Sequence, residues 1–380
     1  MRRRRSARNA SFGPLTRQPP PRNRAYSRHL FALATPGRRS KRRFLRRAPG
    51  ALGIVPPVAL LTPLPLADAQ RLGREFALEV AAIEPLAAGS VNSNFALTCV
   101  DGGRYFARLY EEQGREGALA ELKLVRALAG AGVPVVQCLA RADGAGVGDF
   151  RGKSFAVFPW LDGEILCQGR VSQEACHKLG AALARMHLTT PALARPPEGR
   201  FRITDLRQRL TRIERAEREE FLDDVARIRE ALADYEVQRI SQSAPRGVIH
   251  SDLFRDNVLW TKQGELAALL DFESACEGAF AYDVMVTICA WCYSDKFETT
   301  LVEAFLRGYH AVRPIVGQEV AALKVEGAVG CLRFATTRIT DFSLRAAPGQ
   351  APVRDYRRFL ARLASLEAGD LDASFARALV

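Results

Sequence analysis

The sequence predicts an α+β protein of two lobes, a small five-stranded antiparallel lobe with one helix and a larger, mainly helical lobe. Two observations indicate this order. Short apolar runs separated by turn residues fill residues 80–159, as in a strand-rich sheet. Beyond residue 160, apolar residues recur mostly at helical spacing. A third observation is composition: 48% hydrophobic and 26% charged residues exclude collagen-like, wholly disordered and disulfide-scaffold classes.

The first lobe is expected to hold a short amphipathic helix over 68–78 and a longer helix over 116–131. The Asp101-Gly102-Gly103 sequence predicts a hairpin turn, and 143–152 a turn region. The strands are expected at 80–86, 94–100, 104–110, 133–140 and 154–159.

The second lobe begins after the Trp160-Leu161-Asp162-Gly163 connector. Its expected helices cover 173–187, a charged pair within 205–235, and most of the chain from residue 281 onwards. A strand–loop–strand unit over 247–272 interrupts them. The predicted organisation is therefore a tail (1–57), an N-terminal nucleotide-binding lobe (58–160) and a C-terminal catalytic and substrate-binding lobe (161–380).

The net charge of +13 belongs to the tail. Residues 1–50 hold 16 Lys and Arg and no acidic residue, whereas residues 51–380 hold 39 basic and 42 acidic side chains. The Arg- and Pro-rich tail is predicted to be disordered. Four interpretations stay open: a transit peptide, a twin-arginine-like export signal around 40–46, a nucleic-acid-binding arm, or an extension upstream of a natural start near Val58.

Two further features restrict the class of protein. The longest uncharged stretch, residues 48–67, contains five prolines, which are incompatible with a membrane-spanning helix. The eight cysteines are scattered, and the single Cys289-Ala290-Trp291-Cys292 pair has no second pair to complete a zinc site. Because that pair lies in an apolar, helix-like run, its two cysteines are predicted to be small buried residues, and the scattered cysteines favour a reducing cytoplasm.

The segment from Val248 to Glu273 contains the residue types that phosphoryl transfer needs. That reaction requires a carboxylate to orient the acceptor hydroxyl and accept its proton, and oxygen ligands for Mg²⁺. Asp252 offers the first, and Asn257 and Asp271 offer the second. Each motif is weak alone, but their combination in one strand–loop–strand unit predicts a phosphotransferase active site.

These residues resemble the protein-kinase-like phosphotransferases, which include aminoglycoside phosphotransferases and choline kinases. The string from His250 to Leu259 is most similar to the bacterial homoserine kinases of that superfamily. The polar loop 89–95, Gly-Ser-Val-Asn-Ser-Asn-Phe, resembles their phosphate loop. Segments 282–292 and 331–338 also have counterparts there, so the resemblance covers residues 60–370.

The resemblance implies a role for each matching position, with ATP and Mg²⁺ as cofactors. Asp252 would be the catalytic base and His250 would brace its loop, while Asn257 and Asp271 would bind Mg²⁺. The implied nucleotide contacts are Gly89, Ser90, Asn92, Asn94, Arg108, Glu121, Phe158, Trp160 and Leu161. The implied substrate contacts are Arg255, Trp291, Arg333 and Arg338, with packing in the core as the alternative for Trp291.

Two positions depart from the family pattern. Arg108 stands where such kinases usually have a lysine. Cys289 and Ala290 stand where homoserine kinases usually have Asn-Asp, so a carboxylate expected near the substrate amino group is missing. Asp295 or Asp341 would be its replacement.

Three functions are compared on this basis. The first is a kinase that phosphorylates the hydroxyl of homoserine on the way to threonine, with no need for nucleic acid or membrane. The second is a related kinase acting on another amino alcohol or an aminoglycoside. The third is a nucleotide-binding pseudokinase or a nucleic-acid-binding protein acting through its tail. The presence of Asp252, Asn257 and Asp271 argues against a pseudokinase, and Arg333 and Arg338 favour an acceptor with a carboxylate. The oligomeric state is left open.

Overall fold

The computed structural model describes residues 62–86, 91–189, 198–241, 244–346 and 354–379. All of them belong to one compact unit that starts at residue 56. The predicted tail and the Gly89-Ser90 part of the polar loop lie outside the described residues. No helix in the described ranges combines the length and apolar character needed to cross a bilayer.

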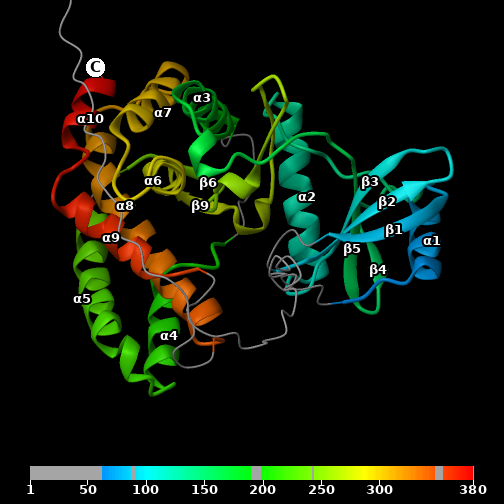
Figure 1. Cartoon of the computed structure of the whole chain (residues 1–380), viewed down its shortest axis with the longest axis horizontal. Coiled ribbons are helices and arrows are strands. Elements are labelled where there is room, and N and C mark those ends of the chain that lie inside the picture. Colours follow the sequence, from blue (N-terminus) through cyan, green and yellow to red (C-terminus); the bar gives the residue numbers. More distant parts are fainter. Residues whose placement is uncertain (1–61, 87–90, 190–197, 242–243, 347–353, 380) are drawn as a thin grey trace, which may run out of the picture. The chain divides into compact units, whose positions relative to one another are not determined.

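A five-stranded antiparallel sheet forms the first lobe, as predicted, with the order β1-β2-β3-β5-β4 (Figure 1). Its strands are β1 (Val80–Leu86), β2 (Ser93–Cys99), β3 (Arg104–Leu109), β4 (Gly148–Phe150) and β5 (Lys153–Pro159).

Two helices cover the two faces of this sheet. Helix α1 (Leu66–Glu75) packs with Phe95, Leu97 and Phe155 in one apolar cluster. Helix α2 (Arg115–Gly130) packs with Ala156 in another. Because successive side chains of a strand point to opposite faces, Arg108 lies on the face of β3 opposite Ala107 and Leu109, where it meets α2.

One strand prediction was wrong. Residues 133–140 are not a strand, although Val135 bridges to Leu269 and the Leu139 N–H donates to the Val157 carbonyl. The fourth strand is instead β4, inside the predicted turn region, and it pairs with β5 through a two-residue hairpin. Arg151 and Gly152 both have positive φ there, the conformation that matches the twist of a tight hairpin.

The second lobe is mainly helical, as predicted. Figure 1 shows helices α3 and α6–α8 gathered around the short strands β6 and β9. Its helices are α3 (Gln173–Thr189), α4 (Ile203–Glu214), α5 (Glu219–Ser241), α6 (Phe280–Trp291), α7 (Thr299–Val312), α8 (Gln318–Arg338), α9 (Arg357–Glu367) and α10 (Asp372–Ala378). Its two-stranded pairs are β6 (Arg246–Ile249) with β9 (Cys276–Ala279), and β7 (Val258–Trp260) with β8 (Leu266–Leu269).

Helices α3 and α7 cross at two glycines. A Cβ atom at Gly180 would lie 2.2 Å from the Phe305 carbonyl oxygen, and one at Gly308 would lie 2.0 Å from that of His177. The two helix backbones are therefore in direct contact. Helix α3 also packs against β6, the strand that leads into the predicted catalytic loop.

All eight cysteines are free thiols. Six of them are buried, Cys138 is half-buried and Cys167 is exposed. The predicted burial is therefore confirmed for Cys289 and Cys292.

Candidate active site

The predicted catalytic loop follows β6 and ends at β7. His250 is fully buried; it stacks against Phe272, and its Nε2 lies 2.9 Å from the Leu270 carbonyl oxygen. Its Nδ1 accepts the Asp252 backbone N–H at 3.3 Å, so Nε2 carries the proton and donates to Leu270. Ser251 has a φ of 68°, a conformation that costs free energy for a residue with a side chain. His250 thus ties this strained turn to the segment that carries Asp271.

The buried carboxylate of Asp283, on α6, binds the backbone of the same turn. Asp283 accepts the backbone N–H groups of His250 and Ser251, both at 2.7 Å. Its Oδ2 also lies 3.0 Å from His187 Nε2, on α3. Burial lowers the pKa of His187, and the neighbouring Asp283 only partly opposes this. Burial alone would raise the pKa of Asp283, but the hydrogen bond with His187 and other nearby groups lower it overall. A neutral His187 and an ionised Asp283 therefore hold the backbone of the loop in place.

Asp252 projects from the loop with one third of its side chain exposed. Burial raises the pKa of its carboxyl group, and the nearby Arg333 guanidinium opposes that rise. Arg333 Nη1 donates to the Ser251 carbonyl at 2.9 Å and lies 3.2 Å from Asp252 Oδ1. Asn257 Nδ2 donates to the Asp252 carbonyl at 2.8 Å, which leaves the Asn257 side-chain oxygen facing elsewhere. The loop thus presents one carboxylate and one amide oxygen.

Asp271 follows β8 in the left-handed conformation, with a φ of 64°. Its Oδ1 lies 3.2 Å from Arg108 Nη1, and the same nitrogen lies 3.6 Å from Glu121 Oε1 on α2. Arg108 Nε also contacts Asn94 Oδ1 at 3.4 Å. Burial alone would lower the pKa of Arg108, but Asp271 and Glu121 together raise it. Arg108 therefore stays positively charged between Glu121 of the first lobe and Asp271 of the second.

The described part of the polar loop reaches the segment after Asp271. Asn92 Nδ2 donates to Glu273 Oε2 at 2.7 Å, and Asn92 Oδ1 accepts the Glu111 N–H at 3.1 Å. Ser93 Oγ donates to the Glu111 carboxylate at 2.5 Å, and Lys153 pairs with the same group. Glu111 therefore fixes the end of the loop, and Asn92 and Asn94 are buried rather than open to the cleft.

A cavity of about 280 Å³ lies beside Asp271. Its walls are mostly apolar and aromatic, with Arg108, Glu121 and Asp271 at the polar end. A flat heteroaromatic ring fits walls of this kind, and a polyanionic tail fits the guanidinium. Of the predicted nucleotide contacts, the cavity brings together Arg108, Glu121, Phe158, Trp160, Leu161 and the metal-ligand candidate Asp271.

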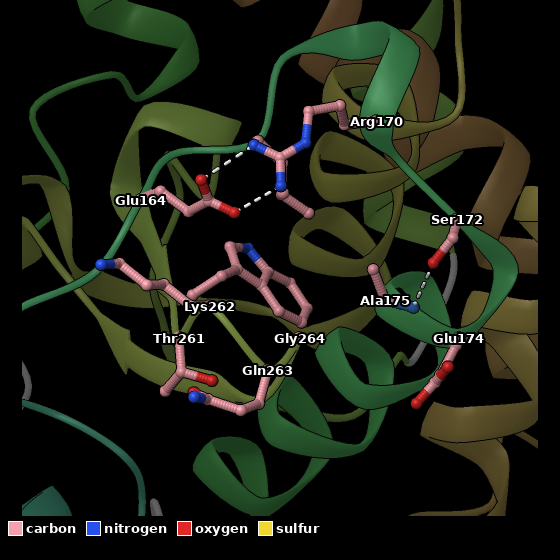
Figure 2. A pocket seen from close by; sticks show the side chains of 11 residues that line it. Glu164, Arg170, Ser172, Glu174, Ala175, Thr261, Lys262, Gln263 and Gly264 are labelled. Carbon is pink, nitrogen blue, oxygen red and sulfur yellow. Dashed lines mark hydrogen bonds and ion pairs between the residues drawn. The ribbon is translucent and has the colours of Figure 1, made fainter.

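A second cavity, of about 170 Å³, shares no lining residue with the first (Figure 2). It lies between the connector after residue 163 and the turn that joins β7 to β8. Glu164 and Arg170 face each other across two hydrogen bonds at its edge, and Ser172 caps the start of α3 through the Ala175 N–H. None of the predicted site residues lines it, whereas the first cavity contains Asp271 and five of the predicted nucleotide contacts; Asp252 and Asn257 line neither cavity.

The structure gives the predicted substrate contacts different positions. Arg333 is almost fully buried against Asp252, and its guanidinium stacks on Phe334 at 3.9 Å. Arg255 donates to the Ala290 carbonyl at 3.3 Å and to Gln168. Arg338 donates to the Asp355 carbonyl at 2.9 Å, and burial together with neighbouring arginines lowers its pKa to about 10.

Trp291 does not fit its predicted role as a substrate contact. Its side chain has no exposed surface, and its Nε1 donates to the Leu253 carbonyl at 3.0 Å. It is a core residue that supports the catalytic loop, the alternative named for it above.

Neither proposed replacement for the missing carboxylate lies free beside Asp252. Asp341 pairs with Arg209 at 2.7 Å. Asp295 is exposed on the turn after α6.

Sequence reasoning missed three side chains that hold the site together. Asp283 and Glu273 lie within recognised motifs, but no role was predicted for either side chain. Arg200 lies in no recognised motif. His187 belongs to the same network: it is buried, and its Nε2 lies 3.0 Å from Asp283 Oδ2. A carboxylate on an otherwise apolar helix such as 280–291 is the one signal that marks Asp283, because a buried charge needs partners.

Comparison with known proteins places the chain in a family. The phosphotransferase enzyme family model matches residues 82–321. A homoserine kinase of Methylobacillus flagellatus is 33% identical over 267 residues, which cover 69% of this chain and 81% of that protein. A homoserine kinase of Methylobacterium radiotolerans is 34% identical over 73% of this chain and 86% of that protein, and one of Neisseria meningitidis serogroup B is 31% identical over 76% and 92%.

Solved structures share the fold at low sequence identity. An amicoumacin kinase in complex with AMP-PNP, Ca²⁺ and Ami has a TM-score of 0.60 at 18% identity, covering 80% of this chain and 93% of that one. A microcompartment-associated aminopropanol kinase has a TM-score of 0.56 at 16% identity, covering 82% and 99%. The predicted two-lobed, protein-kinase-like fold is thereby confirmed. The chain belongs to the phosphotransferase enzyme family and is an ATP-dependent kinase.

Proposed function

We propose that the protein transfers the γ-phosphoryl group of ATP to the hydroxyl of L-homoserine. The observation that supports it most directly is how the Asp252–Asn257 loop joins the segment that ends at Asp271. Asn257 Nδ2 donates to the Asp252 carbonyl at 2.8 Å, the Leu270 N–H donates to the Asn257 carbonyl at 2.9 Å, and Asp271 lines the cavity of about 280 Å³. The similarity of the chain to homoserine kinases supports the acceptor. The C-terminal lobe from residue 161 supplies the catalytic residues, and residues 58–160 form the nucleotide-binding lobe. The free thiols agree with a cytoplasmic enzyme.

Asp252 is the base in this proposal. Its carboxylate orients the acceptor hydroxyl and accepts its proton as the oxygen attacks the γ-phosphorus. Because burial raises its pKa, it is a stronger base than an exposed aspartate. Arg333 and the braced loop hold it in place.

Asn257 and Asp271 would bind Mg²⁺. Asn257 donates its amide hydrogen to the Asp252 carbonyl, so its oxygen is the atom left for a cation. Asp271 has the Arg108 guanidinium at 3.2 Å, a contact that supports its role as a carboxylate that binds a cation. Mg²⁺ takes one or two protein oxygens and completes its shell with phosphates and water. When bound, it neutralises charge on the transferring phosphates.

The nucleotide would occupy the cavity between Arg108 and the residues 158–161. Phe158, Trp160 and Leu161 would flank the base, and Arg108, oriented by Glu121, would contact the phosphates. Gly89, Ser90, Asn92 and Asn94 stay a prediction for the phosphate loop, as do Arg255 and Arg338 for the acceptor carboxylate.

The acceptor is tested by ADP release with homoserine, choline, hydroxylysine and kanamycin. We expect homoserine to give the highest kcat/KM, with ADP formed in equal amount to phosphorylated product. Faster turnover of another acceptor would assign the protein to a related kinase of amino alcohols or aminoglycosides instead.

The base is tested by Asp252→Asn, with Asp256→Asn as the matched control on the same loop. The first should lower kcat by roughly 10²–10⁴-fold, with AMP-PNP still bound at the wild-type Kd. The control should keep kcat within a factor of about three, because Asp256 is exposed and pairs only with Arg354. Wild-type turnover by Asp252→Asn would exclude Asp252 as the base.

A further inference from the structure

Arg200 lies just before α4 and points at the segment that follows Asp271. Its Nη1 donates to Glu273 Oε1 at 2.9 Å, and its Nη2 lies 3.4 Å from Ser274 Oγ. The two partners differ in accessibility, since the Arg200 side chain is 39% exposed and the Glu273 side chain only 5%. The guanidinium group therefore rests on a buried carboxylate while part of it faces solvent.

The same carboxylate connects Arg200 with the polar loop of the first lobe. Asn92 donates to Glu273 Oε2 at 2.7 Å, while Arg200 donates to Oε1. Glu273 is two residues beyond Asp271, the candidate Mg²⁺ ligand. Arg200 thus approaches the expected position of the phosphates from the second lobe, opposite the loop that carries Asn92.

The next residue places this segment against the catalytic base. The Arg333 guanidinium stacks on the Phe201 ring at 4.0 Å, and Arg333 in turn contacts Asp252 at 3.2 Å. Arg200 and Phe201 therefore connect the segment around Asp271 with the loop around Asp252. The phosphoryl group must pass between these two carboxylates.

Two other arginines contact Asp271 and Asp252 directly, but the side chains of both are mostly buried. The side chains of Arg108 and Arg333 are 12% and 4% exposed, respectively. Arg108 is fixed by Asp271 and Glu121, and Arg333 by Asp252 and the Ser251 carbonyl. Of these three arginines, Arg200 has the most exposed side chain, at 39%.

We propose that Arg200 is a catalytic residue that contacts the γ-phosphoryl group during transfer. The proposal rests on the proposed kinase function. In the step, the acceptor oxygen forms a bond to the γ-phosphorus as the bond to the β,γ-bridging oxygen breaks. The electron pair of that bond stays on ADP, and the hydroxyl proton passes to Asp252. Arg200 donates hydrogen bonds to the equatorial oxygens, whose charge is shared in the transition state.

The test compares Arg200→Ala and Arg200→Lys with the wild type, and with Arg202→Ala as the control. Arg202 lies on the same segment, but its exposed guanidinium pairs with Glu198, which precedes α4, and with Asp205 in the first turn of α4. Arg200→Ala should lower kcat by roughly 10²–10³-fold, with KM for homoserine and for ATP within about threefold. Arg200→Lys should retain an intermediate kcat, because lysine keeps the charge without the planar fork. Arg202→Ala should match the wild type.

A binding measurement gives a readout independent of turnover. Arg200→Ala should bind AMP-PNP at the wild-type Kd but bind ADP with aluminium fluoride, which imitates the transferring group, at least tenfold more weakly. Thermal unfolding midpoints equal to the wild type would show that the fold is intact. An unchanged kcat, equal losses for both nucleotide complexes, or a loss confined to KM for homoserine would each overturn the proposal.

If homoserine is not the acceptor, the role of Arg200 can still be tested separately. Slow hydrolysis of ATP with water as the acceptor needs no homoserine, and Arg200→Ala should reduce it in the same proportion. A wild type that hydrolyses ATP but does not phosphorylate homoserine would reject the acceptor and still test Arg200.

Discussion

Arg108 and Glu121 lie close together in a buried position at the polar end of the nucleotide cavity, with Arg108 Nη1 3.6 Å from Glu121 Oε1. Their side chains are 12% and 6% exposed, and Glu121 Oε2 has no hydrogen-bond partner among the described residues. Burial raises the pKa of Glu121 to about 8, and the Arg108 charge only partly opposes this rise. Glu121 is thus a group whose protonation differs between the folded and unfolded chain.

This difference predicts a pH dependence of stability. The folded chain keeps the Glu121 proton up to about pH 8, whereas the unfolded chain releases it near the ordinary value of 4.5. Since the folded state binds the extra proton, the free energy of unfolding should fall as the pH rises through this window. The slope for one proton is about 1.4 kcal/mol per pH unit.

Urea unfolding of the wild type and Glu121→Gln between pH 5 and pH 9 measures this slope. The variant, which cannot ionise, should lose less stability than the wild type over the same range. Parallel profiles would show that Glu121 does not change its protonation on folding.

Single residues also show where prediction from sequence stops. Asp252, Asn257 and Asp271 lie within one short stretch with regular spacing, so their convergence was predictable. Glu273, Asn92 and Arg200 come from three separate segments and meet only after folding. Trp291 was misassigned because a motif match says nothing about which way a side chain points.

At the level of elements, the crossing of α3 and α7 depends on two glycines. A Cβ at Gly308 would lie 2.0 Å from the His177 carbonyl oxygen, a distance that no side chain tolerates. Since the His177 carbonyl oxygen belongs to the backbone, one helix must move away from the other. Helix α3 also carries His187, so a shift at this crossing reaches the Asp283 brace.

Gly308→Ala should therefore destabilise the protein by roughly 1–3 kcal/mol and lower kcat as well. The control is Gly130→Ala at the end of α2, where no atom lies within 4 Å of the added Cβ. This control should be neutral or stabilising by up to about 1 kcal/mol, because alanine is the better helix former. Equal stabilities for the two variants, measured by urea unfolding, would contradict the close crossing.

Elements with strong periodicity were predicted within a few residues, as with α2 and α3. The error at 133–140 has a physical cause. An apolar, β-branched run resembles a strand, but strand formation also needs a partner edge, and β4 takes the edge of β5 through its tight hairpin. Pairing of this kind is decided by competition between segments, which local sequence does not record.

At the level of the whole molecule, the positive charge and the site are separate in the sequence. The side chains that form the described site begin at Asn92, whereas the excess of basic residues ends at Arg47. The charge of the remaining chain is close to neutral, with 39 basic and 42 acidic residues over 51–380. The contacts given above for the site all join residues from Asn92 onwards.

Removal of residues 1–57 should leave kcat and KM for ATP and homoserine unchanged within about twofold. Salt titration of both proteins serves as the control, because a tail that steers anionic ATP would make the full-length KM, but not the truncated one, rise with ionic strength. A truncated chain that folds but loses turnover would show that the tail takes part in catalysis.

Arg108 has a consequence for how such a protein is detected in chemical proteomics. Probes that deliver an acyl phosphate to nucleotide sites react with the amine of a nearby lysine. The residues that line the cavity include an arginine at its polar end and no lysine, and the whole chain has only seven lysines. A guanidinium group stays protonated and is a poor nucleophile. A survey based on amine acylation would therefore miss this kinase even in a cell where it is abundant and saturated with ATP.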